Sequence, residues 1–290
     1  MKWIDKCLNS LRKSTLQSGV IVIDNLSSDG TVQYIAQHFK EVFLVEAGAN
    51  IGFGQANNIG MKLALKENAD YFFLLNQDAW VKEDTIQQLL EAASSNPEYG
   101  ILSPFHLDKS EKQFEPLFAE LFDRYNSSLI PDLYFNRLKG IYETSYIHAA
   151  CWLLSRDCVT TTGGFDPIYY HYGEDDDYLQ RVKYFNLKIG LVPAASVIHD
   201  STYVGWSELE WNENRNMVIA LQQLKKMSPH FRSNVLSFFK AGFDELTTLL
   251  LFRKFKKFRF RLNVFLKAIL NINKIRKSYQ NSFIKGAFLE

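Results

Sequence analysis

Cysteine is scarce in this chain, and long apolar runs are absent. The 290 residues include three cysteines, Cys7, Cys151 and Cys158, and no two of them form a Cys-x-x-Cys pair. This excludes a disulfide framework and gives no sign of a zinc site. No run reaches the ~18 apolar residues of a membrane-spanning helix, and the first residues do not join a basic stretch to an apolar one as a signal peptide does. We therefore expect a cytoplasmic protein.

The chain also lacks internal repeats and low-complexity linkers. It has none of the sequence motifs of RNA- or DNA-binding proteins, which argues against nucleic acid as a partner. Its charges are unevenly spread. Residues 225–290 hold fifteen of the 33 basic and three of the 32 acidic side chains, which leaves 18 basic and 29 acidic side chains in residues 1–224. The two parts should therefore face different partners. We divide the chain into an α/β domain at residues 1–205 and a basic, helical region at residues 206–290.

Short apolar runs alternate with helical patterns along the first part of the chain. Strands are expected at residues 20–24, 42–47, 71–76 and 189–199, and helices at 31–39, 54–67 and 82–95. This alternation predicts an α/β fold with a mainly parallel sheet and helices on both faces. Residues 101–147 are irregular, and we assign no elements there. Ligands of such folds bind at the carboxyl ends of the strands, where polar residues here gather.

Two polar loops follow the first two predicted strands. In DNLSSDGT (24–31), Asp24 and Asn25 can accept hydrogen bonds from a base or a hydroxyl, or the stretch can be an ordinary turn that caps the next helix. In NIGFGQANNIG (50–60), Gly52 and Gly54 would let a phosphate approach the start of a helix. The same glycines could equally serve a tight turn.

The third motif, LLNQDAWV (74–81), ends an apolar strand in Asn76 and Asp78. A carboxylate at this position suits Mg²⁺ or Mn²⁺, which prefer oxygen ligands and often share them with a diphosphate. An Asp in a plain turn is the alternative. His199 ends the last predicted strand and becomes a candidate metal ligand if it lies near Asp78.

The fourth motif, HYGEDDDYLQR (171–181), sets four carboxylates side by side, Glu174 to Asp177. The helix predicted over 174–185 places them in its first turn, where the helix dipole stabilises negative charge. Asp177 and Arg181 are spaced for an ion pair on that helix. A structural role therefore competes with a role in binding or catalysis.

Together these four motifs resemble family 2 glycosyltransferases of the GT-A fold, in particular their rhamnosyltransferase-like branch, which builds bacterial surface polysaccharides. The resemblance covers about residues 1–205. It implies a nucleotide-diphosphate-sugar donor, a dTDP- or UDP-sugar such as dTDP-rhamnose. It also implies a divalent metal, a glycan or lipid-linked glycan acceptor, and inversion at the anomeric carbon.

The resemblance also implies roles for individual residues. Asp175 matches the catalytic base, and Asp78 and His199 match the metal ligands. The donor site would include Asp24, Asn25, Asn50, Gly52, Asn57 and Asn76, and the acceptor or its support would include Glu174, Asp177, Arg181 and Trp152. Asn76 departs from the family pattern, since it replaces the first aspartate of the metal motif.

A second departure concerns the start of the fold. Members of the family begin with an apolar strand that would be central in the sheet, whereas this chain begins at the following helix, WIDKCLNSLRKS. We therefore expect the first strand to be missing. A non-catalytic nucleotide- or sugar-binding relative remains an alternative function. A nucleotidyltransferase is disfavoured, because no glycine-rich basic loop follows the first strand.

The basic region contains LLLFRKFKKFRFRLNVFLKAIL (249–270), in which Phe252, Phe255, Phe258, Leu262, Phe265 and Ile269 recur at helical spacing among Arg and Lys. This composition suits a helix lying on an anionic membrane, which would place the protein on the inner face of the plasma membrane. A helix packed on the first domain with a solvated basic face is the alternative.

Overall fold

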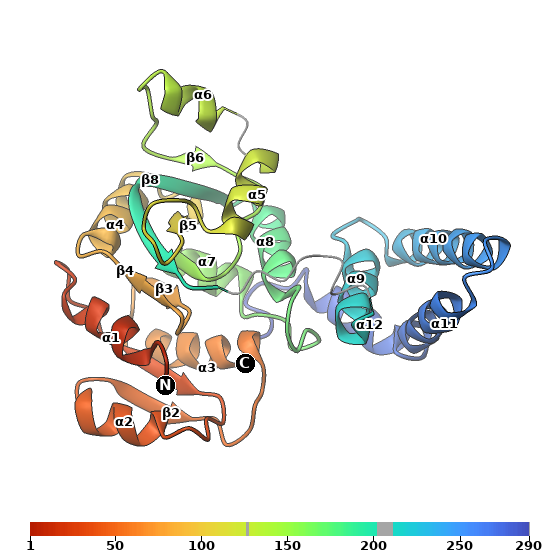
Figure 1. Cartoon of the computed structure of the whole chain (residues 1–290), viewed down its shortest axis with the longest axis horizontal. Helices are drawn as coiled ribbons and strands as arrows, with labels where there is room; N and C mark the ends of the chain where they lie inside the picture. The colour runs from red at the N-terminus through yellow and green to blue at the C-terminus, as the bar shows by residue number, and fades with distance from the viewer. Residues whose placement is uncertain (126–127, 202–210, 290) are drawn as a thin grey trace.

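The computed structural model describes residues 1–125, 128–201 and 211–289. Within these ranges the chain forms an α/β domain and a group of C-terminal helices, drawn at the two ends of the molecule in Figure 1. The strands are β1 (Ile21–Asp24), β2 (Phe43–Glu46), β3 (Tyr71–Leu75), β4 (Ala79–Val81), β5 (Tyr99–Leu107), β6 (Tyr142–Glu143), β7 (Cys151–Ser155) and β8 (Lys188–His199).

The helices of the α/β domain are α1 (Ile4–Arg12), α2 (Thr31–His38), α3 (Phe53–Lys66), α4 (Thr85–Ser95), α5 (Pro116–Tyr125), α6 (Leu129–Tyr134), α7 (Arg156–Thr162) and α8 (Glu174–Tyr184). The C-terminal helices are α9 (Glu213–Lys225), α10 (Phe231–Leu251), α11 (Phe255–Leu270) and α12 (Ile272–Asn281). The expected strands and helices are thus present to within a few residues. The predicted boundary between residues 205 and 206 lies outside the described residues.

The sheet is mixed, so the expectation of a mainly parallel sheet is wrong. The larger sheet has the order β3-β7-β5-β8-β4, with β6 also on β8. Only β5 and β8 run parallel in it, and the other described pairs are antiparallel. The reason is that β7, a strand that the sequence analysis did not predict, inserts between β3 and β5. A simple strand-helix-strand order would have made β3 and β5 neighbours.

The first two strands form a separate parallel sheet. In the described residues β1 pairs with β2 alone, and β3 pairs with β7 alone. The helix α1 packs near β4, and the Cys7 thiol donates to the carbonyl of Asn76 at 3.8 Å.

The main core lies between the larger sheet and helices α3, α7 and α8. Trp152, Phe165 and Tyr178 are fully buried at its centre, with the ring centroids of Phe165 and Tyr178 4.7 Å apart. Burying each such aromatic side chain stabilises the fold by about 1.5–3 kcal/mol. This core fixes the start of α8, and therefore the acidic motif, against the sheet.

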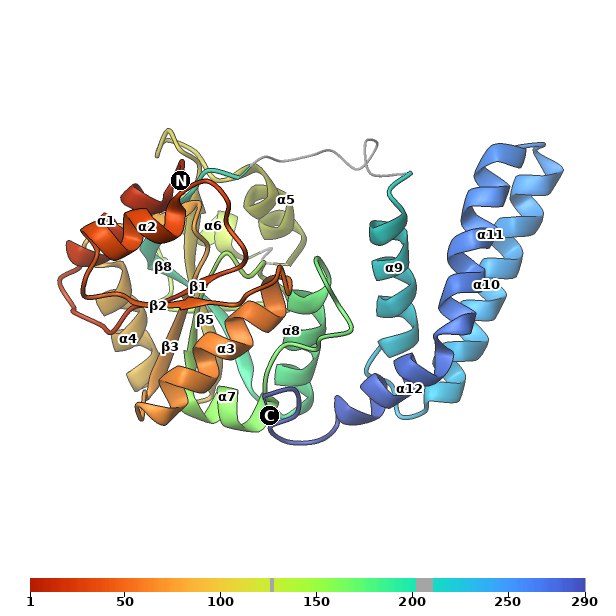
Figure 2. The ribbon, with the colours of Figure 1, turned by 90° about the horizontal axis from the view of Figure 1, so that it is seen from below.

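The C-terminal helices do not continue as the single long helix expected from Leu249 onward. Helix α10 ends at Leu251, Arg253 has a positive φ of 55°, and α11 begins at Phe255, so the two helices form a hairpin. Figure 2 shows α9, α10 and α11 side by side, with the hairpin farthest from the α/β domain. The rings of Phe238 and Phe265 stack at 5.1 Å between α10 and α11.

The end of the chain returns to the α/β domain beside α7 (Figure 2). The amide of Gly164 donates to the carbonyl of Ala287 at 2.8 Å, and that of Gly286 donates to Thr161 at 3.0 Å. Gly163 has a positive φ of 85°, and a Cβ there would lie 1.8 Å from the Ala287 oxygen. The two regions are therefore packed together. Among the described helices, none is long and apolar enough to cross a bilayer.

Candidate active site

The first two motifs meet at one end of β1. Asp24 is 6% exposed, and its Oδ2 accepts from the Ser27 amide at 3.0 Å. Asn25 Oδ1 accepts from the Ile51 amide at 2.8 Å, and Asn50 Oδ1 accepts from the Gly52 amide at 3.1 Å. These hydrogen bonds join the two loops to each other and stabilise their turns at the carboxyl end of β1. The side chains therefore have at least the structural role that was the alternative to ligand binding.

The glycines of the second motif allow close packing against the loop that precedes α8. Gly52 has a φ of 83°, and a Cβ there would lie 2.1 Å from the Tyr170 carbonyl oxygen. A Cβ on Gly54 would lie 2.8 Å from that of Phe165 and 3.6 Å from that of Glu174. In this conformation the chain's own atoms occupy the space beside both glycines. The second and fourth motifs are therefore neighbours.

The asparagines of α3 face different partners. Asn57 Nδ2 donates to the carbonyl of Phe53 within the helix at 3.0 Å. Asn58 Nδ2 donates to the carbonyl of Phe165 at 2.8 Å, and its Oδ1 accepts from the amide of the same residue at 2.7 Å. Asn58, which the sequence analysis did not single out, thus fastens the loop before α8 to α3.

Asp78 and His199 are brought together by strand pairing. Ala79 lies opposite His199 in the β4/β8 ladder, and His199 Nε2 is 3.5 Å from Asp78 Oδ1. The Asp78 side chain is 27% exposed while that of His199 is 8% exposed, so the pair lies at an opening to solvent. The backbone N–H of Asn76 donates to the carbonyl of Ala150 at 2.9 Å. The carboxylate and imidazole suit a divalent cation.

The four carboxylates at the start of α8 have four different environments. Asp177 accepts from Arg181 at 2.9 Å, the ion pair that its spacing predicts, and from Lys225 at 2.6 Å. Asp176 accepts from Gln180 at 3.0 Å. Asp175 is half-buried, and Glu174 is 5% exposed, with no hydrogen-bond partner for its Oε2 in the described structure.

These environments reduce the repulsion within the motif. Burial, and then the charge of Asp175, raise the pKa of Glu174 to about 8 and the pKa of Asp176 to about 6. Burial acts in the same direction on Asp177, but the charges of Lys225 and Arg181 outweigh it and lower the pKa of Asp177. Near neutral pH the turn therefore does not carry four full negative charges.

Arg181 and Trp152 belong to the packed interior. Both are fully buried. Arg181 donates to the carbonyls of Thr162 and Gly164, each at 2.7 Å, and so closes the loop before α8. Trp152 lies 6.2 Å from Phe165 between ring centroids. Each of these two side chains supports the site from behind and has no surface to offer an acceptor.

A short segment that the sequence analysis left unassigned joins the two halves of the site. Tyr146 Oη donates to Asp175 Oδ2 at 2.9 Å, and burial together with the charge of Asp175 raises the pKa of Tyr146 well above its usual value. Two residues later the ring of His148 stacks on that of His199, with centroids 5.6 Å apart. Asp175 and the Asp78 and His199 pair are therefore linked through Tyr146 and His148.

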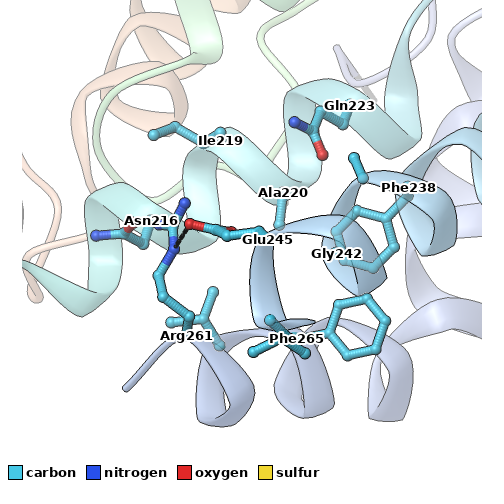
Figure 3. Close-up of a pocket in the computed structure, with 12 residues that line it drawn as sticks. Asn216, Ile219, Ala220, Gln223, Phe238, Gly242, Glu245, Arg261 and Phe265 are labelled. Carbon is cyan, nitrogen blue, oxygen red and sulfur yellow. Dashed lines mark hydrogen bonds and ion pairs between the residues drawn. The ribbon is translucent and has the colours of Figure 1, made fainter. Parts of the chain in front are cut away.

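A small, partly open pocket of about 80 Å³ lies between α9, α10 and α11. Figure 3 shows Arg261 at its polar end, where it donates to Glu245 at 2.6 Å and to Asn216. Phe238, Gly242 and Phe265 line its apolar end (Figure 3). Pockets for organic ligands usually reach about 300–1,000 Å³, so this space is too small for a nucleotide sugar.

Comparison with protein families adds to this geometry. The family described as "Glycosyl transferase family 2" matches residues 1–161. One relative is the N-acetylglucosaminyl-diphospho-decaprenol L-rhamnosyltransferase of Mycobacterium tuberculosis, which is 28% identical over 225 residues, or 69% of this chain and 72% of the relative.

Solved structures show the same fold at low sequence identity. TarS 1–349 of S. aureus, in complex with UDP-GlcNAc, is 14% identical with a TM-score of 0.55, over 97% of this chain and 86% of TarS. GalNAc-T7 with UDP, GalNAc and Mn²⁺ is 15% identical with a TM-score of 0.53, over 78% of this chain and 49% of that one. These neighbours are GT-A-like, so the likeness supports a GT-A-like fold for this chain.

Proposed function

Because this chain belongs to glycosyl transferase family 2, we propose that it transfers a sugar from a nucleotide-diphosphate-sugar donor to a glycan acceptor with inversion at the anomeric carbon. That the chain is a glycosyltransferase related to rhamnosyltransferases follows from the family and from its M. tuberculosis relative. The donor, the acceptor, the stereochemistry and the metal are parts of the proposal.

One observation carries the proposal. The Asp175 carboxylate is half-buried, held by Tyr146, and connected through His148 to a second acidic position formed by Asp78 and His199. Inverting transfer needs one group that takes a proton from the acceptor and, separately, a group that faces the leaving diphosphate. The two positions fit these two tasks.

Asp175 is the proposed catalytic base. A sugar hydroxyl is a weak nucleophile, and a carboxylate that removes its proton during attack on the anomeric carbon accelerates such a step by about 10²–10⁴-fold. The hydrogen bond from Tyr146 and the one from the Asp176 amide, at 2.8 Å, fix the carboxylate in one orientation. The half-buried Asp176 beside it is proposed to bind acceptor hydroxyls, and the buried Glu174 is proposed to support Asp175.

Asp78 and His199 are the proposed ligands of Mg²⁺ or Mn²⁺. They fit this role because one carboxylate and one imidazole converge at an opening, and because GalNAc-T7, which shares the fold, is seen with Mn²⁺. A divalent cation bound there would stabilise the negative charge of the departing nucleotide diphosphate. The residues proposed to bind the nucleotide-sugar donor lie at or near the strand ends. They are Asp24, Asn25, Asn50, Gly52, Asn57 and Asn76.

The donor and acceptor classes are proposed from the relatives. The M. tuberculosis relative is named for L-rhamnosyl transfer to a decaprenol-linked acceptor, and the TarS structure holds UDP-GlcNAc. A dTDP- or UDP-sugar, such as dTDP-rhamnose, and a lipid-linked glycan are therefore the substrates to try first. Such an acceptor would place the protein at a membrane surface, and the basic hairpin of α10 and α11 is the proposed contact.

Sugar transfer by the purified chain tests the base. We expect Asp175→Asn to lower kcat by about 10²–10⁴-fold while nucleotide binding is kept. The control is Asp84→Asn, since Asp84 is exposed at the start of α4 and should leave both quantities unchanged. Transfer that persists in Asp175→Asn would place the base elsewhere. Nucleotide binding without turnover on any donor would favour the non-catalytic alternative.

Calorimetric titration with UDP, dTDP and GDP, each with and without Mn²⁺, tests the donor side. We expect one nucleotide to bind in a metal-dependent way and Asp78→Ala to remove the metal dependence. Metal-independent binding that Asp78→Ala leaves intact would contradict the assignment of Asp78.

A further inference from the structure

Three histidines from distant parts of the sequence meet beside Asp78. His106 lies in β5, His148 precedes β7, and His199 ends β8, and all three are less than a tenth exposed. The ring centroids of His106 and His148 are 4.4 Å apart, and those of His148 and His199 are 5.6 Å apart. One ring nitrogen from each residue lies within 4.8 Å of those of the other two.

Each ring of this cluster has a buried nitrogen without a hydrogen-bond partner in the described part of the chain. These atoms are His106 Nδ1, His148 Nε2 and His199 Nδ1. Leaving a buried polar atom unpaired costs about 1–3 kcal/mol. Three such atoms in one cluster therefore call for a common partner.

The other nitrogens of two rings are already oriented. His106 Nε2 is 3.0 Å from Ser103 Oγ, and His199 Nε2 is 3.5 Å from Asp78 Oδ1. Metal-binding histidines commonly contact a carboxylate or another polar group through the nitrogen that does not bind the metal. In His106 and His199, the unpaired Nδ1 is thus the atom left for an ion.

An ion pair between His148 and Glu115 would satisfy only one of the three unpaired nitrogens. His148 Nε2 is 3.6 Å from Glu115 Oε2, and a protonated His148 could pair with that carboxylate. Burial would raise the pKa of Glu115, but contacts with His148, Ser201 and the Phe118 amide lower it to about 2. This pair leaves the nitrogens of His106 and His199 without a partner, and burial with its two histidine neighbours lowers the pKa of His106, which disfavours a second cation.

We propose that His106, His148 and His199 together bind a divalent transition metal ion such as Zn²⁺ or Co²⁺. Imidazole nitrogens suit these ions better than Mg²⁺. Zn–N bonds are about 2.0–2.1 Å, which puts nitrogens around one tetrahedral ion about 3.4 Å apart. Nitrogens that now lie within 4.8 Å of one another would therefore approach by at most about 1.4 Å. In this arrangement Asp78 is not a ligand but orients the His199 ring. The exposed part of its carboxylate stays accessible to the donor.

The inference rests on the proposed function for the place of the ion, beside Asp78, and revises its ligands: His106 and His148 join His199, and Asp78 becomes the outer partner of His199 instead of a ligand. The two assignments therefore predict different effects of substitutions. If the three histidines hold the ion, metal binding requires His148 and is only weakened by loss of Asp78. If Asp78 and His199 alone hold the ion, metal binding requires Asp78 and does not depend on His148.

The test is titration of the metal-free chain with Co²⁺ alone, followed by its visible absorption, with bound metal measured by mass spectrometry. We expect one ion per chain with the intense spectrum of a tetrahedral site. His148→Ala should weaken binding by at least about 100-fold, and Asp78→Asn by about 10- to 100-fold, the usual effect of an outer partner. The control His230→Ala removes an exposed histidine and should change nothing.

A second readout does not depend on any variant. In the Co²⁺-loaded wild-type chain, paramagnetically shifted imidazole proton signals should come from three histidines. Signals from one histidine, with binding kept in His148→Ala and lost in Asp78→Asn, would overturn the three-histidine site and leave the proposed function standing. Failure of the wild-type chain to bind Co²⁺ or Zn²⁺ would also overturn it.

Discussion

Lys225 is a buried cation that joins the two regions of the molecule. Its Nζ donates to Asp177 at 2.6 Å and to Asp166, and the Ser278 hydroxyl donates to the same Asp166 carboxylate. Lys225 comes from α9 and Asp177 from α8, so the contact ties the C-terminal helices to the acidic motif. Without the lysine, the buried Asp166 would lose this cation and Asp177 would keep Arg181.

We expect Lys225→Met to reduce the free energy of unfolding by about 3–5 kcal/mol, because removing one partner leaves buried charge uncompensated. Urea unfolding followed by circular dichroism measures this. The control is Lys226→Met, since the next lysine is exposed and should change stability by less than about 0.5 kcal/mol. Equal effects of the two substitutions would contradict the role of the network.

Glu174 should make stability depend on pH. Its pKa rises from the ordinary 4.5 to about 8 on folding, so the folded chain holds this proton more tightly than the unfolded chain. The resulting stabilisation is fully present below pH 4.5 and is lost as pH rises through about 8, by up to about 5 kcal/mol. Relative to wild type, Glu174→Gln should therefore gain stability from pH 5 to pH 8 in urea unfolding. Parallel pH profiles of the two proteins would contradict this.

Sequence motifs could predict some site residues and not others. Asp78 and His199 end predicted strands, and strand ends of one sheet edge tend to meet, so their proximity could be expected. Tyr146 and His148 lie in an irregular stretch with no period, and nothing local shows what they face. The scarcity of cysteine argued against a zinc site, yet three histidines separated by some 40–50 residues form the cluster.

At the scale of elements, the loop that begins α3 depends on glycine. Gly52 has a left-handed φ, and the Tyr170 carbonyl lies against it. Gly52→Ala should cost about 1–3 kcal/mol of stability and weaken nucleotide binding, because the loop and the segment before α8 must separate. Urea unfolding and calorimetry measure the two effects.

The matched control is Gly19→Ala. Gly19 has no atom within 4 Å of its would-be Cβ and no positive φ, so the substitution should leave both quantities unchanged. If Gly52→Ala behaves like Gly19→Ala, the contact between the second and fourth motifs is unimportant for the donor side.

Periodicity located most elements of the α/β domain but not the topology of its sheet. Strands such as β3 and β8 are continuous apolar runs, which is why they were found. Strand direction depends on which strands become neighbours, and β7 changes that order by entering between β3 and β5. The helix pattern at 249–270 likewise hides the reversal at Arg253, because Phe and Lys keep a helical spacing across the turn.

At the scale of the whole molecule, charge and shape are divided in the same way. The acidic α/β domain carries the proposed site, and the basic hairpin of α10 and α11 extends from the opposite end (Figure 2). At its turn Leu251, Phe252 and Phe255 are 81%, 72% and 59% exposed, among the exposed cations Arg253 and Lys254. Exposed apolar side chains ringed by cations suit the surface of an anionic membrane.

The apolar stripe of this segment is therefore split between two roles. Phe258, Leu262, Phe265 and Ile269 are half-buried, and Phe265 packs on α10, whereas the residues at the turn are exposed. The segment thus packs on its neighbouring C-terminal helices, which differs from the expected packing on the first domain. Contact of the turn with a membrane stays a prediction.

We expect the chain to sediment with vesicles containing phosphatidylglycerol and not with pure phosphatidylcholine, and to be released by salt, since exposed charges are screened. The double variant Leu251→Ser, Phe252→Ser should bind such vesicles at least about tenfold more weakly, because each side chain gains more than 1 kcal/mol on leaving water. Tyr134→Ser, Phe135→Ser is the control, since both residues are exposed on or next to α6 of the acidic domain. Binding that ignores lipid charge, or that only the control variant weakens, would place the membrane contact away from the hairpin.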